Sequence, residues 1–463
     1  MNGIPFIHLF KNRMGYFFFD VNMNGIVEVD EDTFYLLDEC LKSNDTTKIT
    51  NCKSLSNLIQ KGYLSDKHSK EIKNPLTEYI PDFLTKYLKN LVLQITQKCN
   101  MRCRYCIYSG NGNLSRKHDS RVMSWEVAKA AIDFLRKNSL LSRKIEIGFY
   151  GGEPLLEFAL IKKCVDYCEK IFYDKEVIFS ITTNGTIINN EIIDFFAKYN
   201  FHVMISVDGP KDIHNTNRRL ASNGSGTYAI IYDNLKKIRE RNYDFYKTVT
   251  INGVLEPDQD NTIVERFFEE EELFKELHIM LNRVADTYIE TNYEETNEHI
   301  CTMETLVFKN IMSKITNNEF SVFSSKEKKF DMMSTEFVDL GPLPDDIHHG
   351  GGCMPGHSKM FVDVEGVIRP CEKVSEYSKH MIIGNVYQGF DFGNVEKLLN
   401  IGLITKQECL NCWIIRHCRQ CPSIIDDVDC LSYEQKRNVC AYQIADMKEQ
   451  LNDYIYFRKL GLI

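Results

Sequence analysis

Three cysteines near the start of the chain have the spacing needed for iron–sulfur chemistry. Cys99, Cys103 and Cys106 are separated first by three residues and then by two. Such a motif can ligate three irons of a cubane, so the fourth iron keeps open positions for an outside ligand, as catalytic metal sites do. A structural cluster would want a fourth cysteine nearby, and the next one is Cys164. The motif predicts a catalytic cluster; the alternative is a zinc site or scattered buried thiols.

A second group of cysteines lies in the last quarter of the chain, in a segment that reads as mostly loop. Segments of this kind are usually held together by metal, and two iron–sulfur clusters or a pair of structural zinc sites both fit. Residues 360–369 read as a hairpin turning at Glu365 and Gly366, which places the first two of these cysteines at neighbouring strand ends. The group comprises Cys353, Cys371, Cys409, Cys412, Cys418, Cys421, Cys430 and Cys440.

The overall composition indicates in which compartment these cysteines lie and which roles they can have. The net charge of −9 over 463 residues argues against a nucleic-acid binder. The N-terminus has no basic segment followed by an apolar run, and no stretch of about 18 apolar residues occurs, so we expect neither a secretory signal nor a membrane span. A cytoplasmic location, where thiols stay reduced, favours metal ligands over disulfides for most of the 16 cysteines. Cys164 and Cys168, four apart on a predicted helix, read as small buried hydrophobes.

Alternating strands and helices must position the first cysteine motif. Such alternation implies βαβ units and a parallel sheet of class α/β. Six strands are fewer than the eight of a closed barrel, so we expect an open, TIM-like partial (β/α)6 barrel with its reactive groups at the C-terminal strand ends. The expected strands are 91–96, 145–150, 177–182, 202–207, 249–255 and 278–282, and the expected helices are 127–135, 155–172, 192–199, 230–239 and 263–277.

The chain before the barrel reads as a small separate unit. Two β-prone runs, 16–19 and 26–29, are joined by a turn and followed by helical patterns at 33–41 and 55–64. A hairpin with two or three helices resembles a winged-helix module. The expected parts of the chain are this module (1–80, ending in a linker at 75–81), the partial barrel (88–285), a bridging helix and linker (286–349, with the helix at 293–315) and a Cys-rich domain with a final helix at about 434–457 (350–463).

Over about residues 90–285 the chain resembles the radical SAM superfamily, because an aromatic residue, Tyr105, precedes the last cysteine of a motif that follows the first strand. In that family, S-adenosylmethionine (SAM) chelates the open iron of a [4Fe–4S] cluster, and one electron yields a 5′-deoxyadenosyl radical that takes a hydrogen from the substrate. Typical motifs of the family also follow strands two to four, although Ser206 and Arg218 alone also read as a turn former and a surface arginine. The resemblance assigns cofactor binding to Tyr105, Gly151, Gly152, Glu153, Thr183, Asn184, Ser206 and Arg218.

The later cysteines are similar to those of a SPASM domain, the C-terminal extension of many radical SAM peptide-modifying enzymes. Two departures occur: Cys418 and Cys421 are separated by two residues instead of three, and Cys430 is additional. Cys430 either completes auxiliary cluster I or leaves that cluster open to a substrate thiol. The family's crossed pattern implies three [4Fe–4S] clusters in all, with Cys353, Cys371 and Cys421 at auxiliary cluster I and Cys409, Cys412, Cys418 and Cys440 at auxiliary cluster II.

The N-terminal unit resembles a RiPP recognition element, which binds the leader of a ribosomally made peptide by strand addition; a generic cap on the barrel is the alternative. The whole chain most resembles the sactipeptide and ranthipeptide synthases. This implies a Cys-rich precursor peptide as partner, an electron donor such as flavodoxin or ferredoxin, and thioether bonds from cysteine sulfur to an acceptor carbon. Competing enzyme readings are formylglycine formation by an anaerobic sulfatase-type maturase and peptide carbon–carbon crosslinking. Outside enzymes, the chain would be an iron–sulfur electron carrier or a zinc-binding interaction protein.

Overall fold

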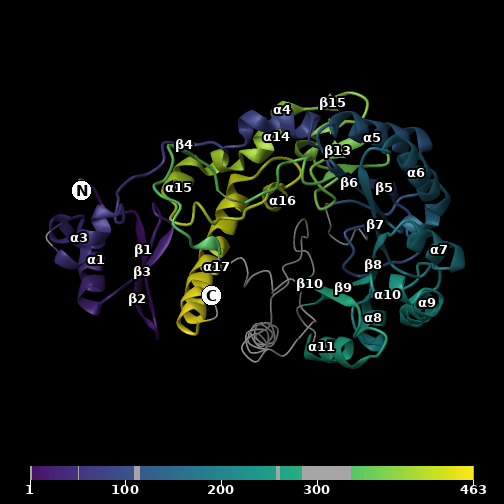
Figure 1. The fold of residues 1–463 in the computed structure, drawn as a ribbon, viewed down its shortest axis with the longest axis horizontal. Coiled ribbons are helices and arrows are strands. Elements are labelled where there is room, and N and C mark those ends of the chain that lie inside the picture. The colour runs from purple at the N-terminus through teal and green to yellow at the C-terminus, as the bar shows by residue number, and fades with distance from the viewer. Residues whose placement is uncertain are drawn as a thin grey trace.

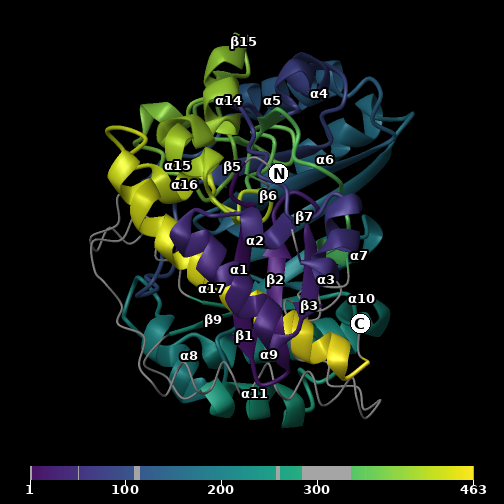
Figure 2. The ribbon, with the colours of Figure 1, turned by 90° about the vertical axis from the view of Figure 1, so that its left-hand side faces the viewer.

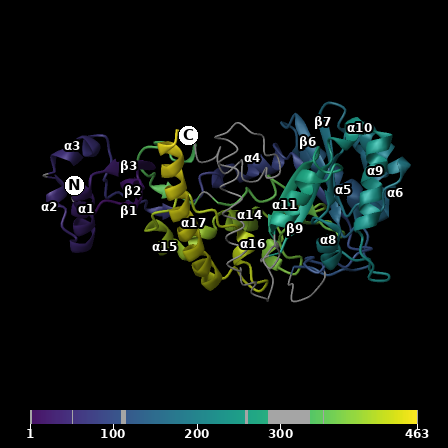
Figure 3. The ribbon, with the colours of Figure 1, turned by 90° about the horizontal axis from the view of Figure 1, so that it is seen from below.

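The computed structural model describes residues 3–50, 52–108, 115–256, 261–283, 335–349 and 351–461. The expected bridging helix at 293–315 and Cys301 lie outside these residues. The molecule is elongated: the N-terminal unit lies at one end, the barrel at the other, and C-terminal segments lie between them (Figures 1 and 3). Among the described helices, none has the length and apolar character needed to cross a bilayer.

Six parallel strands form the barrel sheet, which confirms the expected partial barrel. They run in the order β10-β9-β8-β7-β6-β5, and helices cover the outer face of the sheet (Figure 1). The helix expected at 263–277 is shorter than predicted. It ends at Glu270, and turns follow from residue 272. The strands are β5 (Asn90–Thr96), β6 (Lys144–Gly151), β7 (Glu176–Thr183), β8 (His202–Ser206), β9 (Thr250–Leu255) and β10 (His278–Arg283), and the helices that follow them are α5 (Trp125–Asn138), α6 (Phe158–Ile171), α7 (Asn190–Lys198), α9 (Tyr228–Arg241) and α11 (Asn261–Glu270).

The two faces of the barrel strands differ in polarity. On one face, apolar side chains such as Leu91, Ile147 and Ile205 are fully buried in the core. Glu146 and Ser180 lie on the other face, where they are half-buried. Parallel strands covered on both sides are normally apolar on both faces. The polar inner face therefore indicates an interior that holds water or a ligand.

A C-terminal hairpin extends the barrel sheet beyond its first strand. β12 (Met360–Val362) pairs in parallel with β5 and antiparallel with β13 (Val367–Arg369), which confirms the expected hairpin. The turn contains Gly366 at φ +86°, a conformation that favours glycine. β14 (Gly384–Asn385) and β15 (Gly389–Phe390) bring the sheet to ten strands. The Cys-rich segment is thereby joined directly to the strand that leads into the first cysteine motif.

The N-terminal unit contains a three-stranded sheet, one strand more than the sequence predicted. β2 (Gly15–Asp20) lies between β1 (Ile7–Asn12) and β3 (Gly25–Val29). Phe18 packs in a core with α1 (Glu31–Ser43) and α3 (Lys53–Gln60), whereas Phe19 packs in the core that includes the C-terminal helix α17 (Tyr433–Lys459). Asn12 bonds Asn452, and Glu28 pairs with Lys459, so α17 contacts both edge strands of the sheet (Figure 2).

Short elements connect these parts. The expected linker at 75–81 contains a 3-10 helix and the start of α4, so it is not simply extended. β4 (Glu71–Ile72), just before this linker, pairs in parallel with β11 (Asp346–Ile347), just before the Cys-rich segment. The remaining elements are α2 (Thr47–Thr50), β4 (Glu71–Ile72), η1 (Thr77–Tyr79), α4 (Ile80–Thr85), η2 (Pro154–Glu157), α8 (Lys211–Asn217), α10 (Tyr243–Tyr246), β11 (Asp346–Ile347), η3 (Lys379–Met381), α14 (Phe392–Leu399), η4 (Ile401–Thr405), α15 (Lys406–Leu410) and α16 (Pro422–Ile425).

Candidate functional site

The loop that carries the first cysteine motif leaves the C-terminal end of β5. Its backbone is fastened to the segment that follows α8: the amide of Arg102 donates to the carbonyl of Arg219 at 2.9 Å, and the amide of Ala221 donates to the carbonyl of Asn100 at 2.8 Å. Cys103 is buried, whereas Cys99 and Cys106 are half-buried. These bonds hold the loop in place at the end of the barrel where reactive groups were expected.

The three thiols of this loop lie near one another. Cys99 is close enough to Cys103 and Cys106 for each to influence its ionisation, and burial raises the pKa of Cys99 to about 12. Burial also raises the pKa of Cys103 to about 12, although Arg218 opposes that shift. Thiols with such pKa values hold their protons, so iron binding must displace those protons. Three adjacent thiols fit a cubane with one iron left for an outside ligand.

Two glycines after β6 are required by close packing against the approach to this loop. A Cβ at Gly151 would lie 2.1 Å from the Thr96 carbonyl oxygen, and a Cβ at Gly152 would lie 2.1 Å from the Lys98 oxygen. The Gly152 amide donates to the Thr96 carbonyl at 2.8 Å. The predicted Gly-Gly motif thus sets the position of the backbone that leads into Cys99.

Glu153 is completely buried and accepts three hydrogen bonds. Its Oε1 accepts from the Thr183 hydroxyl at 2.7 Å and from the Leu155 amide at 3.0 Å, and its Oε2 accepts from the Asn184 amide at 2.7 Å. Burial raises the pKa of Glu153 to about 7, while these bonds act in the opposite direction. In this structure Glu153 ties the end of β6 to the end of β7; its assignment to cofactor binding stays a prediction.

Asn184 connects the end of β7 to the cysteine loop. Its side-chain amide donates to the Asn100 side chain at 2.8 Å and lies 3.9 Å from the sulfur of Cys99. Asn100 in turn donates to the Thr186 hydroxyl at 2.8 Å. The structure therefore brings together Cys99, Glu153, Thr183 and Asn184, four residues that the sequence assigned to one site.

A second buried group ties the aromatic residue of the motif to the end of β8. The hydroxyl of Tyr105 donates to Asp208 Oδ2 at 2.6 Å, and Nε of Arg218 pairs with the same oxygen at 2.9 Å. Arg218 also lies over the Tyr105 ring, 5.4 Å from its centre. Ser206, the predicted neighbour, is buried at the end of β8. Arg218 is only 6% exposed, so the alternative reading of it as a surface arginine is wrong.

Replacing Gly151 with alanine is expected to disturb the first cysteine site. Its φ of +141° is costly for any residue with a side chain, about 1–3 kcal/mol, and the added Cβ would overlap the Thr96 oxygen. We expect a lower melting temperature and a smaller content of bound iron after anaerobic reconstitution. Gly393→Ala is the matched control, because its Cβ would come no closer than 3.4 Å to Asp391. Equal iron content in the two variants would contradict this role of the close packing.

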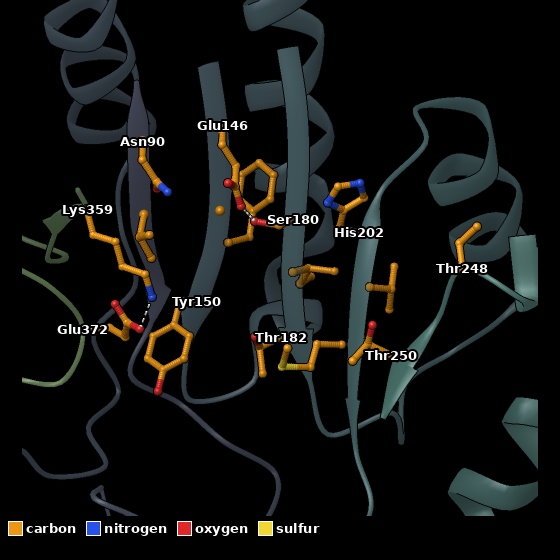
Figure 4. A pocket seen from close by; sticks show the side chains of 16 residues that line it. Asn90, Glu146, Tyr150, Ser180, Thr182, His202, Thr248, Thr250, Lys359 and Glu372 are labelled. Carbon is orange, nitrogen blue, oxygen red and sulfur yellow. Dashed lines mark hydrogen bonds and ion pairs between the residues drawn. The ribbon is translucent and has the colours of Figure 1, made fainter. Parts of the chain in front are cut away.

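A cavity of about 530 Å³ lies against the inner face of the barrel sheet (Figure 4). Its walls combine apolar and polar side chains, and Glu146 Oε1 accepts a hydrogen bond from the Ser180 hydroxyl at 2.8 Å. Side chains from five neighbouring parallel strands contribute to it, together with two residues of the Cys-rich segment. The labelled residues in Figure 4 are Asn90, Glu146, Tyr150, Ser180, Thr182, His202, Thr248, Thr250, Lys359 and Glu372.

Glu372 projects into this cavity from the position directly after Cys371. One of its oxygens pairs with Lys359 Nζ at 2.5 Å, and the other is buried without a hydrogen-bond partner among the described residues. Tyr150, beside it in Figure 4, is close enough to both Cys106 and Glu372 for each to influence its ionisation. The cavity is therefore bounded on one side by a tyrosine close to the first cysteine loop and on the other by a carboxylate of the Cys-rich segment.

A buried polar network joins the barrel to the Cys-rich segment. Arg116, fully buried, donates to the carbonyl of Val374 at 3.0 Å and to the hydroxyl of Tyr108 at 3.0 Å. Its Nε lies 3.4 Å from Glu376, which also accepts from Gln97 at 2.9 Å. Because buried charges are stable only when paired and hydrogen-bonded, this network fixes the two regions relative to each other.

Four of the later cysteines share one cavity of about 260 Å³: Cys409, Cys412, Cys418 and Cys440. These are the residues expected at auxiliary cluster II. Burial raises the pKa of Cys412 to about 12 and that of Cys418 to about 11. Four thiols around a common cavity fit a cluster with four cysteine ligands.

The cysteines expected at auxiliary cluster I lie in a different place. Cys353 and Cys421 line another cavity, and Cys421 lies close enough to Cys371 to influence its ionisation. Cys430 is exposed, and its thiol donates to Asp427 at 3.3 Å. Nowhere in the described part of the chain are three Cys, His, Asp or Glu side chains placed to hold one metal ion together. The ligand sets of both auxiliary clusters stay predictions.

Sequence reasoning assigned no role to several residues of these sites. Asp208 was visible only as part of a motif after the fourth strand, yet it organises Tyr105 and Arg218. Glu372 carried one signal, its place next to Cys371. Gln420 and Lys436, which line the cavity of the four later cysteines, carried no signal, because an amide and a lysine in a polar segment are ordinary until the fold buries them.

Residues 93–268 match the family described as the Radical SAM superfamily. Radical SAM cyclopropyl synthase TigE of Paramaledivibacter caminithermalis is 24% identical over 427 residues, 85% of this chain and 83% of that protein. A cysteine-type anaerobic sulfatase-maturating enzyme of Clostridium novyi is 24% identical over 71% of this chain and 85% of its own length. An uncharacterized protein of Methanocaldococcus jannaschii is 40% identical over 122 residues, but the chain spans only 39% of its length.

A solved structure, native anSMEcpe with bound AdoMet, has a similar fold. It superposes with a TM-score of 0.60 at 19% identity and covers 81% of this chain and 99% of its own. The family match implies a [4Fe–4S] cluster and SAM, the pair of cofactors that the first cysteine motif predicted.

Proposed function

The chain contains a radical SAM domain over residues 93–268, and we propose that it modifies a ribosomally made, Cys-rich peptide by forming thioether bonds. In this proposal, Cys99, Cys103 and Cys106 hold the cluster that binds SAM. The two later groups of cysteines hold auxiliary clusters I and II, for three [4Fe–4S] clusters in total.

The cavity in the barrel is the observation that supports this proposal most. It is bounded by Tyr150, which is close to Cys106, and by Glu372, which follows Cys371. A substrate in the cavity would therefore lie between the first cysteine loop and the predicted ligands of auxiliary cluster I. Its volume of about 530 Å³ suits a peptide segment of a few side chains.

The proposed reaction replaces a C–H bond and an S–H bond by a C–S bond. When bound, the clusters supply the electron that cleaves SAM and accept the electron left after bond formation. The chain's own residues hold the substrate: the polar inner face of the sheet offers hydrogen bonds to a peptide backbone. The hydrogen atom of the acceptor carbon leaves with 5′-deoxyadenosine, and the thiol proton passes to Glu372, whose carboxylate lines the cavity.

The N-terminal unit is proposed to bind the leader of the precursor. We assign residues 1–80 to a winged-helix-like recognition element, 88–285 to the barrel, 286–349 to a bridging segment and 350–463 to a SPASM domain. β1 and β3 are edge strands of the small sheet, and a peptide can add a strand to such an edge through main-chain hydrogen bonds. The contact of α17 with this sheet holds the unit beside the Cys-rich segment.

A precursor without its leader is expected to be modified far more slowly. Tethering the core peptide through a bound leader raises its effective concentration, and the expected loss is about 10²-fold or more in rate at low peptide concentration. The rate is measured by mass spectrometry of the full precursor and of the core alone. Leader added as a separate peptide should not restore the rate to that of the intact precursor. Equal rates with and without a leader would contradict the role given to the N-terminal unit.

Carbon–carbon bond formation on a peptide is the second candidate, because the relative similar over most of the chain is described as a cyclopropyl synthase. Formylglycine formation is the third, because another relative is described as a cysteine-type anaerobic sulfatase-maturating enzyme. All three begin with the same hydrogen abstraction and differ in what the substrate radical then does.

Mass spectrometry of a co-expressed Cys-rich peptide separates these candidates. Each thioether bond removes two hydrogens from the peptide. It also converts one thiol into a thioether sulfur, which no longer reacts with an alkylating agent. A loss of two hydrogens with every thiol still alkylatable would indicate a carbon–carbon bond. An aldehyde at a former cysteine or serine would indicate formylglycine. Either of the last two results would overturn the thioether assignment.

A further inference from the structure

A lysine side chain is buried in the cavity that holds the four cysteines of auxiliary cluster II. Lys436 is completely buried and lines this cavity together with Cys409, Cys418 and Cys440. It is the fourth residue of α17, near the positive end of the helix dipole, where a further positive charge is disfavoured. Burial of an ammonium without an anion beside it is costly, so this position demands a compensating charge.

The side chain that is hydrogen-bonded to that ammonium is neutral. Lys436 Nζ donates to the side-chain oxygen of Gln420 at 2.5 Å. Glu408 also lines the cavity and is close enough for Lys436 to contribute to lowering its pKa, but its oxygen accepts from Tyr433 and pairs with Arg437 at 3.8 Å. Gln420 is also completely buried. Its amide donates to the sulfur of Cys440 at 3.4 Å and to the Lys436 carbonyl at 3.3 Å. The two side chains thus form a short chain of hydrogen bonds that ends on a thiol of the site.

We propose that Lys436 is the counter-charge of auxiliary cluster II and raises its reduction potential, and that Gln420 positions the ammonium and donates a hydrogen bond to the Cys440 thiolate. This inference rests on the proposed function, because it takes the four cysteines as ligands of a cubane. It goes beyond that function by naming two residues that change the reduction potential of the cluster without ligating it.

The physical basis is the change in charge on reduction. A cubane held by four thiolates is an anion, and one added electron makes it more negative. A buried cation beside it stabilises the reduced state more than the oxidised state, since the interaction is strong where water is excluded. Hydrogen bonds to the cysteine sulfurs act in the same direction. The expected result is a cluster able to accept the electron released when the substrate bond closes.

The test is a potentiometric titration followed by electron paramagnetic resonance on the full chain. The Cys99→Ala/Cys103→Ala/Cys106→Ala background removes the first cluster and leaves the signals of the two auxiliary clusters. In that background, Lys436→Met should lower the midpoint potential of one auxiliary cluster by at least the equivalent of a tenfold change in its reduction equilibrium, about 59 mV for one electron. Lys436→Arg, which keeps the charge, should restore most of the potential. Lys448→Met, an exposed lysine on the same helix, is the control and should leave both potentials unchanged.

Each outcome bears on a different claim. Iron for two cubanes, about eight ions per chain, with unchanged potentials in Lys436→Met would overturn the inference and leave the cluster assignment intact. If zinc replaced half of that iron, the assignment of the four cysteines to an iron–sulfur cluster would be wrong. If Lys436→Met does not retain iron, Gln420→Leu decides: it keeps the lysine but loses the hydrogen bond to Cys440. A lower potential in Gln420→Leu supports the inference, and an unchanged potential overturns it.

Discussion

Replacing Cys103 with alanine is expected to abolish the formation of 5′-deoxyadenosine. Cys103 is the most buried thiol of the first motif and lies beside Arg218, so its loss removes a ligand that no neighbouring side chain can replace. An iron left with fewer thiolates does not keep the cubane that SAM must bind. The expected result is product at background level, together with a loss of about one third of the bound iron, the share of one cluster in three.

The measurement uses anaerobically reconstituted protein, a chemical reductant and SAM, with chromatographic detection of 5′-deoxyadenosine. Cys52→Ala is the matched control, because Cys52 lies in the N-terminal unit next to Ser54 and belongs to none of the proposed ligand sets. The control should keep full iron and full product. Cleavage of SAM by the Cys103→Ala variant at an undiminished rate would show that the cluster responsible is held elsewhere.

Replacing Glu372 with glutamine is expected to separate the first half of the reaction from the second. The substitution keeps the size of the side chain but removes the carboxylate that faces the cavity. Cleavage of SAM should continue, because Glu372 is not in the first cysteine loop. Formation of the modified peptide should fall by about 10²–10⁴-fold, the usual contribution of a positioned general base.

Peptide product and 5′-deoxyadenosine are measured in the same reaction, so the ratio between them is the readout. Glu365→Gln is the control: this carboxylate is 63% exposed at the hairpin turn and pairs with Arg121 at 2.8 Å. It should behave like the unaltered protein. A Glu372→Gln variant that keeps the original ratio at an unchanged rate would remove Glu372 from the reaction.

The barrel was predictable because its signals are local. Strand and helix patterns alternate along residues 91–282, and each of the six predicted strands is present within two residues of its expected ends. β1 was missed, since its hydrophobic pattern is short and begins close to the N-terminus. The pairing of β12 with β5 was also missed, because a contact between residues 360 and 91 leaves no trace in either segment alone.

The candidate site was predictable to the extent that its chemistry resides in residue types at fixed spacing. The first cysteine motif and the residues after strands two and three met these conditions, and the structure gathers them around Asn184. The role of Glu153 in tying two strands together could not be predicted, because it depends on three hydrogen-bond donors that only the fold brings to it. The roles proposed for Lys436 and Glu372 also depend on the fold. It places Lys436 beside four thiols and Glu372 in the wall of the barrel cavity.

The central claim is that the first cubane has one iron without a protein ligand, which SAM occupies. The most direct measurement compares the electron paramagnetic resonance spectrum of the reduced protein before and after SAM is added, with metal analysis of the same sample. The account predicts iron at this site and a changed spectrum for one cluster alone, a change that is absent when Cys99, Cys103 and Cys106 are all alanine. A spectrum indifferent to SAM, or zinc bound by these three cysteines, would contradict it.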